Sequence, residues 1–284
     1  MDMRRPTGAP EPLLLLNQDL ETPLARDCDG GTAVLFSHAA PGRAGHNEDA
    51  LALLPAPEDG GVLVVADGLG GQPAGEQAAA LAIRQLAHSI AAAGDDASAL
   101  RNAILNGIEQ ANRNIIDSGS GGATTLAAVE IRDGVVRPYH VGDSMILVTG
   151  QRGRIRLQTI SHSPVGYAVE AGLLDERQAI HHEHRHLISN VIGSTDMRIE
   201  VGAPVRLAPR DTLLIASDGL FDNLHVQEIV DTIRKGPLPE AARNLQQRCA
   251  RRMERPQAGQ PSKPDDLSFI LFRLHPHRTS LAAQ

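Results

Sequence analysis

The stretch Val62-Leu63-Val64-Val65-Ala66-Asp67-Gly68-Leu69-Gly70-Gly71 decides both the fold class and the kind of site. Its first five residues are all apolar and three of them are valine, which is typical of a buried β-strand. An aspartate stands at the exit of that strand. Glycines then follow closely and allow the backbone to approach another group. A rigid strand end therefore holds the Asp67 carboxylate in a fixed place.

Acidic residues stand beside apolar runs at four further places. They are Asp218 after 213–217, Asp143 after 139–142, Asp49 before 50–54, and Asp265-Asp266 before 267–272. Carboxylates that converge repel one another, and a divalent cation is the usual remedy. Ligand sets made only of oxygen suit Mg²⁺ or Mn²⁺. Because two such ions activate water and neutralise a phosphoryl group, the pattern predicts metal-assisted hydrolysis of a phosphate ester.

Asp-Gly is also a common turn dipeptide, so each instance needs its own interpretation. Asp133-Gly134 separates two apolar runs and is followed at once by Val135, as in a two-residue hairpin turn. Asp67 and Asp218 differ from it, because each leaves a fully apolar strand and precedes Gly-Leu. We therefore assign these two to the site and Asp133 to a turn.

The composition excludes several classes of partner. The net charge is -7, with no Trp and only 2% aromatic residues, which opposes binding to nucleic acid or to an anionic membrane. No apolar run approaches the ~18 residues of a membrane span. Cys28 and Cys249 are the only cysteines, as expected in a reducing compartment. We expect a cytoplasmic protein, monomeric, without nucleic-acid or membrane partners.

The chain divides into residues 1–31, a lead-in with one added strand at Leu13–Leu16, a single domain over 32–274, and a tail over 275–284. Strands are expected at 33–38, 62–66, 123–130, 135–141, 145–149, 155–160, 205–207, 211–216 and 267–274, and helices at 74–93, 97–117, 163–181, 225–234 and 238–255. Strands come in blocks that helical pairs interrupt. This order favours an α+β layered fold over a doubly wound sheet.

Six segments carry a resemblance to a known family. In chain order they are Asn47–Ala50, Val65–Gly71, Gly122–Leu126, His140–Ser144, Ser217–Asp222 and Asp265–Ser268. With these segments the chain resembles the PPM, or PP2C-type, metal-dependent protein Ser/Thr phosphatases of bacterial type. The resemblance implies a four-layer α-β-β-α sandwich, in which two antiparallel sheets are flanked by helical pairs. It also implies hydrolysis of phosphoserine and phosphothreonine on proteins, which reverses a Ser/Thr kinase in signalling.

The resemblance assigns roles to the matching positions. Asp67 would bridge two ions, Mn²⁺ or Mg²⁺, and the Gly68 carbonyl would ligate one of them. Asp218 and Asp265 would complete the ligand set of the first ion. Metal-bridging water or hydroxide would be the nucleophile, with no phosphoenzyme.

The remaining assignments surround this core. Glu48 would hold the second ion, with Asp49 in support, and Asp143 would help to bind a third, weaker ion. Arg43 matches the family's phosphate-contacting arginine, but it lies one residue further from the Glu-Asp pair than the family pattern has it.

Three departures from the family pattern stand out. Leu69 occupies the position where animal enzymes carry a histidine, so the leaving group must be protonated from elsewhere. The usual Asp-His-Ser is Ser161-His162-Ser163. The usual Asp-Asn is Asp265-Asp266, whose extra carboxylate either tunes metal affinity or faces solvent. The His-rich segment 181–186 is interpreted as a solvated loop, with a pH-sensitive flap as the alternative.

Two other functions remain open at this stage. One is a catalytically impaired member of the family that binds phosphoproteins, and the other is a phosphoesterase that acts on a small molecule. The complete set of carboxylates argues against the first, and nothing in the sequence excludes the second.

Overall fold

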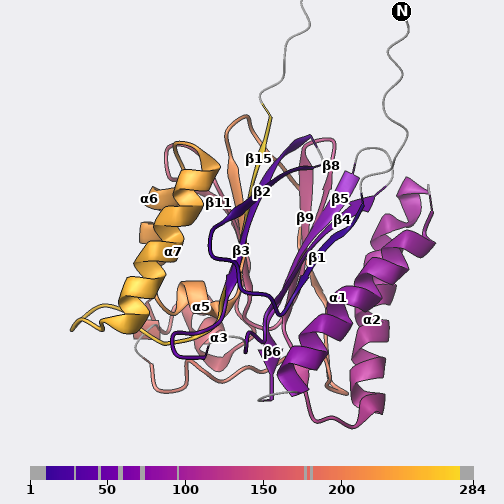
Figure 1. Ribbon diagram of the computed structural model, residues 1–284, viewed down its shortest axis with the longest axis horizontal. Helices are drawn as coiled ribbons and strands as arrows, with labels where there is room; N and C mark the ends of the chain where they lie inside the picture. Colours follow the sequence, from indigo (N-terminus) through magenta and orange to yellow (C-terminus); the bar gives the residue numbers. More distant parts are fainter. Residues whose placement is uncertain are drawn as a thin grey trace, which may run out of the picture.

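The computed structural model describes residues 11–28, 30–43, 46–56, 60–70, 74–94, 96–175, 178–179 and 182–275. Two antiparallel sheets lie face to face, and a pair of helices covers the outer face of each (Figure 1). This arrangement confirms the predicted four-layer α-β-β-α sandwich.

The first sheet carries the helices α1 (Ala74–Ala92) and α2 (Leu100–Ser118). Its strands, in spatial order, are β1 (Leu13–Leu16), β4 (Ala50–Ala56), β5 (Gly60–Ala66), β8 (Leu126–Arg132), β9 (Val135–Val141) and β12 (Glu200–Val201), with β13 (Val205–Arg206) also paired to β9. Every pair is antiparallel.

The second sheet carries α6 (Val226–Ile233) and α7 (Leu238–Glu254). Its strands, in spatial order, are β11 (Ile155–Gln158), β10 (Met145–Thr149), β14 (Thr212–Ala216), β15 (Leu267–Leu274), β3 (Gly31–His38) and β2 (Leu24–Cys28). Four short elements lie near one end of the sandwich: β6 (Gly68–Leu69) paired with β7 (Ala123–Thr124), α3 (Pro164–Glu170) and α5 (Asp218–Phe221). The 3₁₀ turn η1 (Ala97–Ala99) connects α1 to α2.

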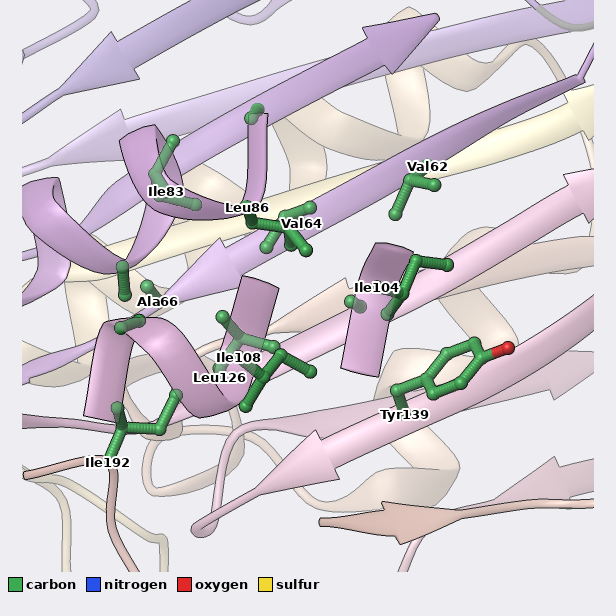
Figure 2. Close-up of a cluster of buried hydrophobic side chains, with 14 of the residues drawn as sticks. Val62, Val64, Ala66, Ile83, Leu86, Ile104, Ile108, Leu126, Tyr139 and Ile192 are labelled. Atoms are coloured by element: carbon green, nitrogen blue, oxygen red, sulfur yellow. The ribbon is translucent and has the colours of Figure 1, made fainter. Parts of the chain in front are cut away.

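Strand β5 is buried on both faces, which explains its unbroken apolar run. Val62 and Val64 pack against the helices α1 and α2, beside residues such as Ile83 (Figure 2). Leu63 and Val65 point the other way and pack against the second sheet. A strand between a helical layer and another sheet has no solvent-facing side, so its hydrophobic residues do not alternate with polar ones.

Two sequence expectations need correction. The lead-in contributes the expected strand β1, but it also contributes β2, so the sheets begin before residue 32. The helix expected over 163–181 ends at Glu170, and Gly172 beyond it has a φ of 70°. The turn at Asp133-Gly134 is confirmed, because both residues have positive φ and join β8 to β9.

Among the described residues, no helix is both long enough and apolar enough to cross a membrane.

Candidate metal centre

The carboxylates converge because the central strands of both sheets end on the same side of the sandwich. Ala50 of β4 pairs with Ala66 of β5. Asp49, just before β4, and Asp67, just after β5, therefore lie at the same end of two neighbouring strands. In the second sheet, Ala216 of β14 pairs with Met145 of β10. The residues just beyond those strand ends include Asp218 and Asp143, whose negative charges act on Asp67.

The carboxylates lie close enough for their negative charges to raise one another's pKa. The pKa of Asp67 is raised well above its usual range, first by burial and then by the negative charges of its neighbours. These neighbours are Asp49, Asp218, Asp143 and Asp265. Burial also raises the pKa of Asp143, to about 8, with Asp218 as the next cause. The structure therefore brings together five of the predicted carboxylates.

Two oxygen atoms of the cluster are available for a cation. Glu48 Oε1 and Asp143 Oδ1 are buried and, among the described residues, have no hydrogen-bond partner. A buried carboxylate oxygen without a partner is costly unless it binds a cation. With oxygen as the only donor type in the cluster, the site fits Mg²⁺ or Mn²⁺.

The segment around Thr124 and Thr125 fixes the backbone of Asp67. The Asp67 carbonyl accepts hydrogen bonds from the Thr125 N–H at 2.9 Å and from Thr124 Oγ1 at 2.8 Å. Thr125 Oγ1 also lies 2.7 Å from Ser144 Oγ, beside Asp143. These contacts show that Thr124 and Thr125 pack beside the site and hold the Asp67 backbone in place.

Gly68 and Gly75 permit the start of α1 to pack directly against the segment that follows β5. A Cβ on Gly68 would collide with the carbonyl of Gly75, and a Cβ on Gly75 would lie 2.5 Å from Glu48 Oε1. Neither position accommodates a side chain without movement. Gly71, which the sequence included in the same motif, lies outside the described residues.

Asp49 lies beneath the cluster, not at its surface. Its side chain is 1% exposed, and Oδ2 accepts a hydrogen bond from Ser217 Oγ at 3.0 Å. A carboxylate buried more deeply than the rest of the cluster fits the supporting role that the resemblance implies.

Asp266 is buried, which excludes the alternative that its carboxylate faces solvent. Its two oxygens accept hydrogen bonds from the backbone N–H groups of Ala40 and Glu48, both at 2.7 Å. An asparagine could not accept with both of its terminal atoms. Asp266 therefore anchors the backbone that carries Glu48.

Arg43 reaches the site. Its Nη2 lies 3.0 Å from Glu48 Oε2, and its side chain is 47% exposed. The guanidinium opposes the effect of burial on the pKa of Glu48, which nevertheless remains raised. Residues 44 and 45, between Arg43 and the Glu-Asp pair, lie outside the described residues.

Sequence reasoning missed two residues at this site, Lys263 and Asp222. Lys263 Nζ lies 2.6 Å from Asp218 Oδ2, 3.1 Å from Asp222 Oδ2 and 2.8 Å from Asp265 Oδ2. Their positions in the chain offered a signal, because each lies a few residues from a predicted ligand.

A cleft of about 440 Å³ opens beside the carboxylates. Asp143, Asp218 and Asp222 form its acidic end. The rest is mainly apolar, with side chains from α3 and the region after α5, and Arg185 also lines it. A partly apolar cleft next to a charged site suits a segment of protein chain better than a small polar molecule.

A histidine cluster outside the acidic site is structural. His140, His162 and Glu200 lie within reach of one cation. However, His162 Nδ1 accepts from the N–H of Gly142 at 3.0 Å and from Asn190 Nδ2 at 2.9 Å. Nε2 must then carry the proton that faces Glu200 at 3.1 Å, and a protonated nitrogen cannot ligate a metal. Even without the family's aspartate before it, His162 anchors the residue that precedes Asp143.

The His-rich segment lies on the surface where it is described. His184 and His186 are exposed, and His182 is partly buried. His181 lies outside the described residues. The exposure fits the solvated-loop interpretation.

Comparison with known proteins gives a consistent set of relatives. The sequence matches the family model described as protein phosphatase 2C over residues 37–258. It is 30% identical to protein phosphatase PhpP of Streptococcus pneumoniae over 192 residues, which are 65% of this chain and 77% of that protein.

Solved structures share the fold. Serine/threonine phosphatase Stp1 of Staphylococcus aureus matches with a TM-score of 0.74 and 26% identity, over 91% of this chain and 100% of that one. The catalytic domain of the serine/threonine protein phosphatase PstP, solved with two manganese ions, matches with a TM-score of 0.65 over 89% of this chain and 99% of that one. At 24% identity, the likeness to PstP shows the fold alone.

Proposed function

The chain belongs to the protein phosphatase 2C family, and on that premise we propose that it is a metal-dependent hydrolase of phosphoserine and phosphothreonine on proteins. Its relatives are named protein phosphatase and serine/threonine phosphatase. The observation that carries the proposal is the convergence of carboxylates around Asp67, with buried oxygens that have no partner in the described part of the chain.

We assign the metal ligands as the resemblance implies. The proposed set is Asp67 as the bridge, the Gly68 carbonyl, Asp218 and Asp265 for the first ion, Glu48 supported by Asp49 for the second, and Asp143 for a third, weaker ion. When bound, Mn²⁺ or Mg²⁺ lowers the pKa of water and neutralises charge on the phosphoryl group. Ligand type does not choose between the two metals.

Arg43 supplies the phosphate contact in this proposal. Glu48 accepts a hydrogen bond from Arg43 Nη2, and a guanidinium group has five N–H donors in all. Arginine binds phosphate oxygens through parallel N–H donors, and the half-exposed guanidinium lies at the rim of the acidic site. Leu69 has no proton to donate, so the leaving alkoxide takes its proton from water.

The proposed substrate is a phosphorylated protein whose chain lies in the apolar cleft next to Asp218. Its phosphate comes from a cognate Ser/Thr kinase, which this enzyme opposes. The chain has only two cysteines, Cys28 and Cys249, which are too few for a disulfide framework, and this supports a cytoplasmic location. We further propose that the enzyme acts as a monomer.

The proposal is tested by hydrolysis of a phosphothreonine peptide with Mn²⁺. We expect Asp67→Ala and Asp218→Asn to lose nearly all activity and to remain folded, because each removes a proposed ligand to the first ion. Asp133→Asn is the matched control, since that aspartate serves only a hairpin turn and asparagine tolerates its φ of 51°. Full activity in either site variant, or activity that survives EDTA, would contradict the mechanism.

A further inference from the structure

Three carboxylates surround the ammonium group of Lys263. Nζ lies 2.6 Å from Asp218, 3.1 Å from Asp222 and 2.8 Å from Asp265. An ammonium group has three donors, and each of these carboxylates accepts one of them at hydrogen-bond distance. The four side chains are only 16–28% exposed, so solvent screens the interaction weakly.

The choice of lysine is unusual for this chain. Of its 27 basic residues, only Lys235 and Lys263 are lysines, and the rest are arginines. A lysine ammonium is a compact point charge on a flexible stem, whereas a guanidinium is planar and broad. A compact charge can lie among three converging carboxylates in the way a small cation does.

This position overlaps with the proposed metal centre. Asp218 and Asp265 are the proposed ligands that complete the first ion, and Lys263 contacts both of them. A divalent cation on the same two carboxylates would repel the ammonium group. Asp222 is not a proposed ligand, so Lys263 has a carboxylate onto which it can withdraw.

We propose that Lys263 is an internal counter-ion, which holds the carboxylate cluster together before metal binds and competes with the first divalent cation for Asp218 and Asp265. The inference rests on the proposed metal-dependent function and adds to it a residue that sets metal affinity. Lys263 leaves the two ligands when the cation arrives and remains paired with Asp222.

The test is calorimetric titration of Mn²⁺ into EDTA-stripped, re-dialysed protein, with wild type, Lys263→Met and Lys235→Met compared. Methionine keeps an unbranched stem of similar length and removes the charge. We expect Lys263→Met to bind Mn²⁺ about tenfold more tightly or better, because the competing charge is gone. Lys235 is exposed and lies outside the site, so Lys235→Met should bind as wild type does.

Thermal unfolding gives a second readout that needs no activity. Without metal, Lys263→Met should melt several degrees below wild type, because the carboxylates lose their counter-ion. With saturating Mn²⁺ that difference should shrink. A lysine that serves only as a structural ion pair would instead lower the melting temperature equally in both conditions and leave the Mn²⁺ affinity unchanged, and this result would overturn the inference.

Amine labelling of the wild-type protein tests whether Mn²⁺ displaces Lys263 from Asp218 and Asp265, and it needs no variant. With only two lysines, mass spectrometry can compare Lys263 directly with Lys235. We expect Mn²⁺ to increase the labelling of Lys263 relative to Lys235, and an unchanged ratio contradicts displacement. Mn²⁺ binding that is equal in wild type and Lys263→Met would refute the inference alone. Absence of Mn²⁺ binding in all three proteins would refute the proposed function as well.

Discussion

Hydrogen bonds hold the backbone of Asp67 in place, while the carboxylates around it disfavour the negative charge of its side chain. Its N–H donates to Thr125 Oγ1 at 3.3 Å, and its carbonyl accepts from the same residue's N–H at 2.9 Å. The side chain, by contrast, lies among other carboxylates that raise its pKa. Such an arrangement costs stability in the protein alone and is explained by a cation that it serves to bind.

Asp143 gives a prediction for the pH dependence of stability without metal. Burial and the nearby Asp218 raise its pKa from 3.8 to about 8. Between those values the folded protein holds a proton that the unfolded chain has released, so the free energy of unfolding falls as pH rises from about 4 to about 8. We expect the melting temperature in EDTA to fall across this range, as measured by differential scanning fluorimetry.

The control for this prediction is Asp143→Asn. Since asparagine does not titrate, the variant should lose less stability over the same pH range. If the melting temperature fell equally with pH in the two proteins, Asp143 would not hold a proton in the folded state.

At the scale of residues, sequence patterns located the carboxylates but not their surroundings. Asp67 and Asp218 were predictable because each ends a fully apolar strand. Lys263 and Asp266 were not, because both lie in or beside the irregular segment after α7, where no periodicity indicates which way a side chain points. Only the folded loop brings Lys263 to Asp218 and Asp266 to the N–H of Glu48.

Among the elements, the contact between the start of α1 and the loop after β5 governs the site. Gly75 of α1 lies so close that a Cβ there would be 2.5 Å from Glu48 Oε1 and 2.9 Å from Leu69 N. The helix start therefore limits where the Glu48 carboxylate can lie.

Gly75→Ala tests this contact. We expect it to destabilise the protein by about 1–3 kcal/mol, through overpacking, and to weaken Mn²⁺ binding, because Glu48 must move. Gly107→Ala is the control, since its Cβ would press on Leu86 at the α1–α2 contact and not on the site. Calorimetric titration should show altered Mn²⁺ affinity only for Gly75→Ala. Unchanged affinity in Gly75→Ala would mean that the helix start does not position Glu48.

The elements that sequence patterns predicted best are those buried on both faces or along a clear helical stripe. β5, β14, α1 and α7 lie close to their expected bounds. β2 was missed because Leu24–Cys28 is an edge strand with exposed Ala25, Arg26 and Asp27, so its side chains give no apolar signal. α3 is shorter than expected because the chain turns at Gly172, where positive φ ends the helix.

Across the whole molecule, the site joins the two sheets. Ser217, after β14 of the second sheet, donates to Asp49, before β4 of the first, at 3.0 Å. Asn47 donates to Ser37 of β3 at 2.8 Å in the same region. A cation held between carboxylates of both sheets would add a further link, so metal binding should stabilise the entire sandwich.

The order of six short motifs predicted the sandwich and the family, because together they span both sheets. The cleft could not be predicted in the same way. Its walls bring together α3, the segment that includes Arg185 and residues in and after α5, and no sequence pattern indicates that these segments meet around one space. The proposed path of the substrate chain therefore rests on the structure alone.

The measurement that tests the central claim most directly is a crystal structure of the protein loaded with Mn²⁺, with the ions located by anomalous scattering. We expect two ions bridged by Asp67, one of them contacting Asp218 and Asp265, with Lys263 Nζ withdrawn from both carboxylates. Ions bound elsewhere, for example at His140 and His162, or Lys263 still in place with no ion beside Asp67, would contradict the account.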